Sequence, residues 1–333
     1  MRRSRFILVP TLGLAAAAAL AACGSGSDDP AADGEISVVT AFYPLTFATE
    51  RVGGDHVAVT NLTPAGQEPH DLELAPSDIA AIEEADFVVY LKGFIPELDA
   101  AVEEYAADKS LDVLTAVETS EYDYTQAIEE EEEAHAEEEA TEEATATEDE
   151  HGHEEELEGV DPHVWLDPIR YGQIGTAIGE GLAGLDEVNA ADYTAGAEAL
   201  NADLTSLDAE FTDALAARAS DTIVTSHAAF GYLADRYGLT QIAISGLSPD
   251  QEPDSQHMAE VAEYVETNGI STIFFETLVS PDIADTLAAE TGAQTAVLNP
   301  IEGLTQEQLD ADADYFTVMR ENLATLQTAL GAA

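Results

Sequence analysis

The amino-acid sequence predicts an α/β protein with two α/β lobes, each built on a parallel sheet and joined by a long rigid linking helix. In both the first and the last third of the chain, short β-branched apolar runs alternate with helical stretches, which is typical of parallel sheets covered by helices. A long amphipathic segment separates these two regions. The 333 residues are 45% hydrophobic, which is enough to build two cores of ordinary domain size.

The first residues are typical of an exported protein. Residues 1–22 run from three arginines through an apolar stretch to small residues, which is the pattern of a secretory signal peptide. They end at "LAAC", which resembles the lipobox of bacterial lipoproteins, and Cys23 is the only cysteine of the chain. We therefore expect removal of the signal peptide, lipidation of Cys23 and a flexible tether over residues 23–35. The alternative is a chance cysteine beside an ordinary cleavage site.

The charge balance excludes one large class of partners. The chain has 68 acidic and only 10 basic residues, so nucleic acid is not an expected partner. The acidity extends over the whole chain, and solubility explains it without any specific function. A cation, however, is attracted by such a field.

Residues 36–165 predict the N-terminal α/β lobe. The run "ISVVT" starts it, and further strands are expected at residues 57–62 and 87–91, with helical stretches between them. This lobe includes residues 129–158, which hold 17 acidic residues and no lysine or arginine. Such a segment cannot bury enough apolar surface to offset its ordering entropy, so it predicts a disordered acidic loop.

Residues 166–218 predict the linking helix region. Apolar side chains recur at intervals of three or four between residues 193 and 215, which indicates one long amphipathic helix. From residue 190 to 218 this helix would extend about 43 Å at 1.5 Å per residue, enough to cross both lobes and resist hinge bending. A helical hairpin that belongs to only one lobe is the alternative.

Residues 219–333 repeat the pattern and predict the C-terminal α/β lobe. The expected strands are residues 221–226, 241–245, 271–277 and 295–300. The expected helices are residues 228–239, 255–268 and 281–291.

Three of the eight histidines occupy strand exits or a rigid turn. His70 follows a strand and a glycine-containing turn, His163 lies in "DPHVWLDP", and His227 stands where a strand ends and a helix begins. Ligands of α/β sheets bind at the carboxyl ends of the strands, so these positions favour a metal site between the lobes. A structural or surface role is the alternative for each of them. We expect His56 and His257 to be exposed and outside the site.

Four segments resemble the metal-binding solute receptors of bacterial ABC importers, a family of zinc- and manganese-binding lipoproteins. They are "EPHDLELAPSDI", "DPHVWLDP", "SHAAFGYLADRYGL" and "VLNPIEGLT", and the resemblance covers nearly the whole mature chain in the same order. It implies that His70, His163 and His227 bind the metal through imidazole nitrogen. Some zinc-binding members have aspartate where this chain has Asn299, and others use the glutamate three residues later. Because a neutral amide replaces a carboxylate poorly, Glu302 is the predicted fourth ligand.

The predicted ligand set favours zinc. Three neutral imidazoles and one carboxylate suit Zn²⁺, whereas manganese prefers sets that are richer in oxygen. Glu276 is expected to orient one imidazole as a residue outside the ligand set. The alternative is an ordinary charged residue at a strand end. The resemblance implies a monomeric, extracytoplasmic receptor, anchored by lipid to the outer face of the cytoplasmic membrane, that passes Zn²⁺ to an ABC permease and its ATPase. A manganese or iron receptor of the same family is the alternative.

The sequence does not predict an enzyme. Four protein ligands leave no open position for a catalytic water, and the motifs HExxH, GxSxG and a phosphate-binding glycine loop are absent from the sequence. A secreted zinc hydrolase stays possible only if Glu302 does not coordinate. Cell adhesion is a role proposed for some family members, but no segment of this sequence encodes a partner surface.

The acidic loop gains a possible role from the same resemblance, because zinc-binding members often carry a His- and acid-rich insertion at this place. We expect three histidines in it to hold Zn²⁺ loosely and to raise its local concentration, an effect that salt would weaken. These are His135, His151 and His153. A solvated spacer is the alternative.

Overall fold

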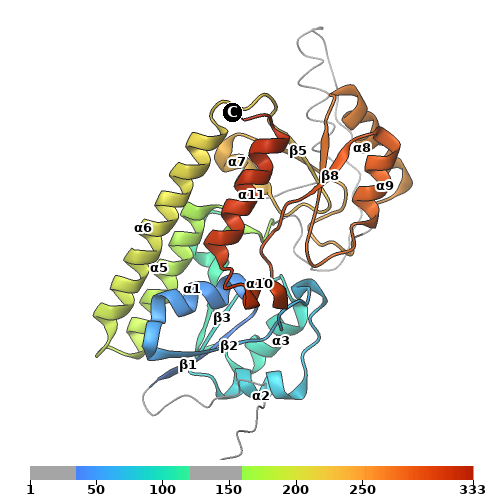
Figure 1. The fold of residues 1–333 in the computed structure, drawn as a ribbon. Coiled ribbons are helices and arrows are strands. Elements are labelled where there is room, and N and C mark those ends of the chain that lie inside the picture. Colours follow the sequence, from blue (N-terminus) through green and yellow to red (C-terminus); the bar gives the residue numbers. More distant parts are fainter. Residues whose placement is uncertain (1–34, 121–159, 252, 333) are drawn as a thin grey trace, which may run out of the picture. The chain divides into compact units, whose positions relative to one another are not determined.

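The computed structural model describes residues 35–120, 160–251 and 253–332, all within one compact unit that begins at residue 31 (Figure 1). No helix in these ranges is both long and apolar enough to cross a membrane. The predictions for the signal peptide, Cys23, most of the tether and the acidic loop lie outside the described residues.

The first sheet has four parallel strands in the order β2-β1-β3-β4. The strands are β1 (Ile36–Thr40), β2 (Val57–Asn61), β3 (Phe87–Tyr90) and β4 (Ser110–Asp112). The helices of this region are α1 (Tyr43–Gly53), α2 (Pro76–Glu84) and α3 (Pro96–Tyr105). The central strands β1 and β3 are mostly buried, which accounts for their nearly continuous valine-rich sequences.

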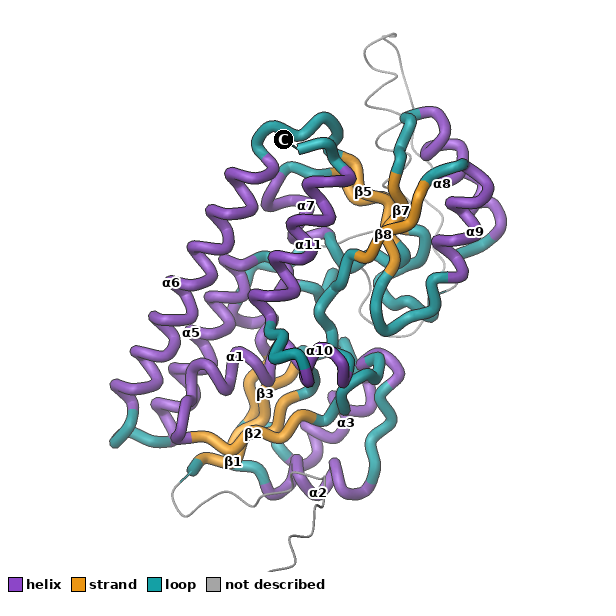
Figure 2. Tube along the Cα trace, viewed as in Figure 1, coloured by secondary structure: helices purple, strands orange, loops and turns teal. Residues whose placement is uncertain are grey.

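The second sheet repeats this topology with the order β6-β5-β7-β8. Figure 2 labels three of its strands, β5, β7 and β8. Its parallel strands are β5 (Thr222–Thr225), β6 (Thr240–Ala243), β7 (Thr272–Phe275) and β8 (Gln294–Val297). The helices are α7 (Gly231–Tyr237), α8 (Ser255–Thr267), α9 (Asp282–Thr291), α10 (Gln306–Asp310) and α11 (Tyr315–Ala329). The prediction of an α/β protein with two parallel sheets is confirmed.

The region predicted as one linking helix contains two. Helix α5 (Pro168–Leu185) and helix α6 (Ala190–Leu215) form a hairpin and lie side by side (Figure 1). The chain turns because the carboxylate of Asp186 accepts the backbone N–H groups of Val188 and Asn189. Helix α6 contacts α1, which follows the first strand of the first sheet, and it also contacts α7 and α11, which belong with the second sheet. The hairpin therefore does not belong to one sheet alone. The lobe boundaries at residues 165 and 218 stay predictions.

One continuous hydrophobic core joins elements of both sheets, and a second cluster lies around α8 and α9. Trp165 is fully buried in the larger core, and its indole N–H donates to the carbonyl of Pro300 at 2.7 Å. The hydroxyl of Tyr315 donates to the carbonyl of Trp165, also at 2.7 Å. These bonds fix the segment after His163 to the segment that precedes Glu302.

Candidate metal centre

The four predicted ligand residues meet at one point. His70, His163, His227 and Glu302 each offer one donor atom, and these atoms all lie within 4.8 Å of one another. His163 and His227 have no exposed side-chain surface and Glu302 has 1%, whereas the side chain of His70 is 10% exposed. The cluster is therefore buried, and of these four side chains His70 is the one nearest to solvent.

Strand ends and short turns bring these side chains together. His70 lies in the 3-10 turn Pro69–Asp71, where the Glu68 carboxylate accepts its backbone N–H at 3.3 Å. His227 lies two residues after the end of β5, and Glu302 follows β8 after a short loop. In parallel sheets such carboxyl ends are where ligands bind.

Two of the imidazoles are fixed by a carboxylate on the far side of the ring. His163 Nδ1 lies 2.7 Å from Asp161 Oδ1, and His227 Nδ1 lies 2.7 Å from Glu276 Oε1. An N–H group at each Nδ1 donates to the carboxylate and leaves Nε2 to face Glu302 Oε1, at 3.1 Å and 3.3 Å respectively. Such carboxylate–imidazole pairs fix the tautomer and the ring orientation of metal-binding histidines.

His70 is held differently. Its Nε2 lies 3.6 Å from Glu302 Oε1, and its ring packs against Phe94 with 4.2 Å between the ring centroids. Within the described ranges, the structure records no carboxylate hydrogen-bonded to the other nitrogen of His70.

The sequence predicts that Glu276 orients an imidazole, but the same role of Asp161 was not predicted. A local signal for Asp161 exists, because a carboxylate two residues before a histidine in the rigid sequence "DPH" is close enough to bond to its ring.

The charges of the cluster shift the titration of its members. Burial alone lowers the pKa of His227, but the negative charges of Glu276 and Glu302 outweigh it and raise that pKa well above its usual value. For His163, burial is likewise outweighed by hydrogen bonds to Asp161 and Glu302, and its pKa is raised. Burial lowers the pKa of His70.

Two glutamates in the centre titrate in opposite directions. Burial works against ionisation of Glu302, but the charge of His227 and hydrogen bonds from the histidines hold its pKa well below the usual range. Burial, together with the nearby charge of Glu302, raises the pKa of Glu68 to about 9. At neutral pH the centre thus holds one ionised glutamate among the imidazoles and one neutral glutamic acid beside it.

Asn299 shapes the turn that carries Glu302. Its side-chain oxygen accepts the backbone N–H of Ile301 at 2.7 Å, and Ile301 has a φ of 59°, in the left-handed region. The backbone of Asn299 exchanges two hydrogen bonds with the side chain of Asn322. The amide oxygen of Asn299 is therefore engaged in the turn, whereas Glu302 Oε1 faces the three imidazoles.

The comparison with known proteins identifies the family. Residues 38–329 match the family described as ZnuA, zinc-uptake complex component A, periplasmic. The chain belongs to this family. The resemblance seen in the four sequence segments is thereby confirmed.

Curated and solved relatives agree with this membership. The zinc-binding protein AdcA of Streptococcus pyogenes is 38% identical over 296 residues, 89% of this chain and 56% of its own length. The high-affinity zinc uptake system protein ZnuA of Bacillus subtilis is 36% identical over 318 residues, 93% of each chain. The crystal structure of Zn(II)-bound AdcA from Streptococcus pneumoniae has a TM-score of 0.70 at 33% identity, covering 89% of this chain and 58% of that one. The chain thus spans little more than half the length of its AdcA relatives.

A cavity of about 340 Å³ leads from solvent to His70. Its other lining residues are Gly93, Phe94, Pro96, Pro162, Leu247, Ser248, Asp250 and Gln251. Among the described residues that line it, Asp250 is the only acidic one. We call this cavity the vestibule.

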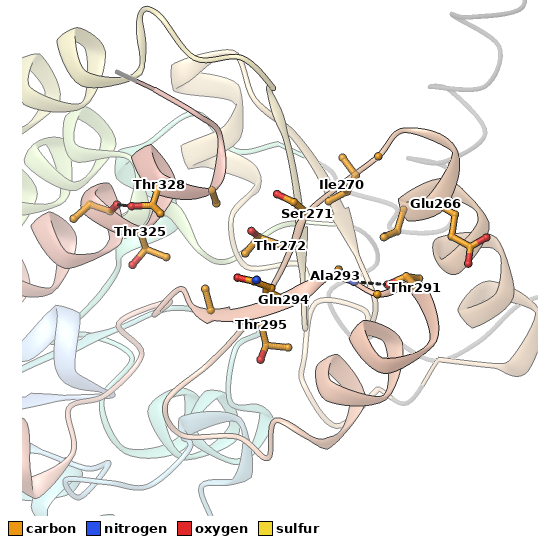
Figure 3. A pocket seen from close by; sticks show the side chains of 16 residues that line it. Glu266, Ile270, Ser271, Thr272, Thr291, Ala293, Gln294, Thr295, Thr325 and Thr328 are labelled. Carbon is orange, nitrogen blue, oxygen red and sulfur yellow. Dashed lines mark hydrogen bonds between the residues drawn. The ribbon is translucent and has the colours of Figure 1, made fainter.

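A larger cavity of about 890 Å³ lies elsewhere, beside β7, β8 and α11 (Figure 3). The sixteen described residues that line it are mainly small or hydroxyl-bearing, and among them Glu266 is the only titratable one. It therefore lacks the donors that a zinc ion requires.

One of the two excluded histidines does not lie where the sequence suggested. His257 is buried on α8, and its ring Nε2 bonds to the carbonyl of Ala243 at 3.0 Å, so the expectation of an exposed side chain is wrong. The reason is that its face of α8 packs onto the end of β6. His56 is partly exposed and bonds to Asp192. The histidines of the acidic loop (His135, His151 and His153) lie outside the described residues.

Proposed function

We propose that this protein is an extracytoplasmic receptor that captures Zn²⁺ and delivers it to an ABC-type permease for high-affinity uptake. The observation that carries the proposal is the buried group of three imidazole nitrogens and one carboxylate oxygen, all within 4.8 Å. Such a nitrogen-rich set suits Zn²⁺, whereas manganese favours more oxygen ligands. The names of the AdcA and ZnuA relatives support the same cargo.

His70, His163, His227 and Glu302 act as the four ligands in this proposal. A closed tetrahedron leaves no position for a reactive water, which suits storage and transfer of the ion better than catalysis. The ionised Glu302 offsets one of the two charges of the zinc ion. Because His70 borders the vestibule, the ion arrives past His70 and meets the two fixed imidazoles behind it.

The partners follow from the sequence and the family. After cleavage, a diacylglycerol on Cys23 anchors the protein, as a monomer, to the outer face of the cytoplasmic membrane. Residues 23–35 act as the tether that lets the folded part reach the permease. The ATPase on the other side of the membrane drives release of the cargo.

The test is metal analysis of protein purified without added metal, combined with chelator competition for Zn²⁺ and Mn²⁺. We expect one tightly bound zinc per chain and weaker manganese binding, and Glu302→Ala should lose the tight zinc. Tighter binding of Mn²⁺ than of Zn²⁺ would favour a manganese receptor. Chelator-sensitive hydrolysis of generic esters or phosphoesters would favour a hydrolase instead.

The acidic segment is proposed to collect zinc for this centre. His135, His151 and His153 lie among many carboxylates, which favours loose and rapidly exchanging binding. Deletion of residues 129–158 should then remove weak binding events from a zinc titration and spare the tight one. An unchanged stoichiometry would leave the segment the role of a spacer.

A further inference from the structure

Three residues distant in the chain meet beside the metal centre at one phenol hydroxyl. Tyr232 on α7 accepts the backbone N–H of Ser120 at 2.9 Å and donates to the carbonyl of Asp161 at 2.8 Å. The backbone N–H of Asp161 donates to the carbonyl of Ser120 at 3.0 Å. We call this group of Ser120, Asp161 and Tyr232 the tyrosine junction. It joins the two ends of the chain segment between residues 120 and 161.

Asp161 is also held on its other sides. Its Oδ1 accepts the backbone N–H of His163 at 2.9 Å and lies 2.7 Å from the ring Nδ1 of the same residue. On the opposite side the backbone of Gly231 approaches so closely that a Cβ there would lie 2.5 Å from Asp161 Oδ2. Asp161 is 1% exposed, so its carboxylate has little freedom to leave the imidazole.

Helix α5 fixes Tyr232 in turn. The guanidinium of Arg170 lies 4.9 Å from the centre of the Tyr232 ring, a cation–π contact. Arg170 also donates to the carbonyl of Glu118 at 3.1 Å and to Asp167 Oδ2 at 2.6 Å. The contact with Arg170 thus holds the ring of Tyr232 in the position from which its hydroxyl bonds to Ser120 and Asp161.

We propose that Tyr232 is a positioning residue of the metal centre. Its hydroxyl holds Ser120 and Asp161 together, and Asp161 then keeps His163 Nε2 directed at Glu302. Because both ends of the segment between residues 120 and 161 are held at Tyr232, the orientation of His163 does not depend on that segment. The inference rests on the zinc-binding function proposed above.

The first experiment removes only this hydroxyl. Tyr232→Phe keeps the ring against Arg170, and we expect its zinc Kd to rise about tenfold, at the lower end of the range for residues behind a ligand. Tyr237→Phe is the matched control, because it lies on the same helix and its hydroxyl bonds to Asp208 at 3.2 Å. Its zinc Kd should stay within about twofold of the wild type, a change of only about 0.4 kcal/mol.

A second readout does not need zinc. The backbone N–H of Asp161 donates to Ser120, and the backbone N–H of His163 donates to the side chain of Asp161. Hydrogen exchange of both groups should speed up in Tyr232→Phe and stay unchanged in Tyr237→Phe. A short glycine linker in place of residues 121–159 should retain the affinity of the full chain. In that variant the short linker alone keeps Ser120 and Asp161 close together, so Tyr232→Phe should cost less zinc affinity than it does in the full chain.

The outcomes separate the two proposals. A wild-type protein that binds no zinc contradicts the receptor function, and the exchange measurement then still decides on the junction. Unchanged zinc affinity and unchanged exchange in Tyr232→Phe overturn the positioning role. Equal losses of affinity in the full chain and the linker variant also overturn it, because they indicate a general effect on the fold.

Discussion

The three histidines of the centre fall into two classes. His163 and His227 are fully buried, and each has a carboxylate 2.7 Å behind its ring. His70 is partly exposed at the vestibule and packs on the face of Phe94. In the proposed zinc site, two ligands would therefore be oriented in advance, and we expect the third, His70, to adjust when an ion arrives. Fixed ligands favour affinity because less freedom is lost on binding, and an adjustable ligand at the surface favours access.

The two classes also differ in charge. The pKa is raised for His163 and His227 but lowered for His70. In the proposed zinc site, His70 would therefore meet the ion as a neutral base, whereas the fixed pair would first give up protons. One residue type thus serves two purposes because its surroundings differ.

The largest expected effect is the removal of a fixed ligand. If about 10–16 kcal/mol of zinc binding is shared by four ligands, each contributes about 3 kcal/mol, or a factor of roughly 10²–10³ in Kd. We expect His227→Ala at the upper end, because it also leaves Glu276 and Glu302 buried without this partner. His70→Ala should lie at the lower end. Chelator competition measures both, and a greater loss in His70→Ala would contradict the division into two classes.

A smaller effect is expected from the carboxylates behind the fixed rings. Asp161→Asn and Glu276→Gln should each weaken zinc binding about 10- to 100-fold, because the ring loses its charged acceptor. Asp192→Asn is the control, since Asp192 contacts the excluded His56 at the surface. If all three variants bind zinc alike in chelator competition, the fixed rings owe nothing to their carboxylates.

The smallest expected effect is the change in zinc affinity per pH unit. Because the pKa of His227 in the folded protein lies well above the usual histidine value of 6.5, we expect zinc to displace a proton at neutral pH. Affinity should then fall as pH falls through that raised value, about tenfold per unit for each proton released. Calorimetry in buffers of different ionisation enthalpy counts these protons. His70→Ala should release as many as the wild type, because His70 is already neutral.

The same shift affects the stability of the metal-free protein with a definite sign. A raised histidine pKa adds stability that is fully present below the unfolded value of 6.5 and is lost as pH rises through the folded value. The lowered pKa of Glu302 acts in the opposite sense, because its contribution is present above 4.5 and is lost as pH falls through the folded value. Zinc binding without any proton release at pH 7 would contradict the raised pKa of His227, and with it the expected pH dependence of stability from that residue.

The strands were predictable because local sequence determines them. Residues 57–62 and 87–91 match β2 and β3 within one residue at each end, since their apolar β-branched runs are short and bounded by polar residues. Helix α5 was not foreseen as a separate helix, because its glycines make it a poor helix former by itself. Packing explains it, since a Cβ at Gly175 would lie 2.8 Å from the side chain of Leu200 on α6.

The site was predictable only in part. Strand ends and the family resemblance together pointed to the four residues that converge. Asp161 had a local signal in its spacing from His163, which was overlooked. Tyr232 and Glu68 had no such signal, because each acquires its role from a contact with a segment far along the chain. Such contacts exist only after the chain has folded.

The donors of the centre come from four segments, the first at residue 70 and the last at residue 302. No proteolytic fragment that lacks residue 70 or residue 302 can bring all four together. Zinc loading would therefore report that the segments from residue 70 to residue 302 have folded together. At a free zinc concentration of about 1,000 times Kd, the ion would add about 4 kcal/mol to the free energy of unfolding. The loaded protein should accordingly melt at a higher temperature than the empty one and resist proteases longer, so its lifetime would depend on the metal supply.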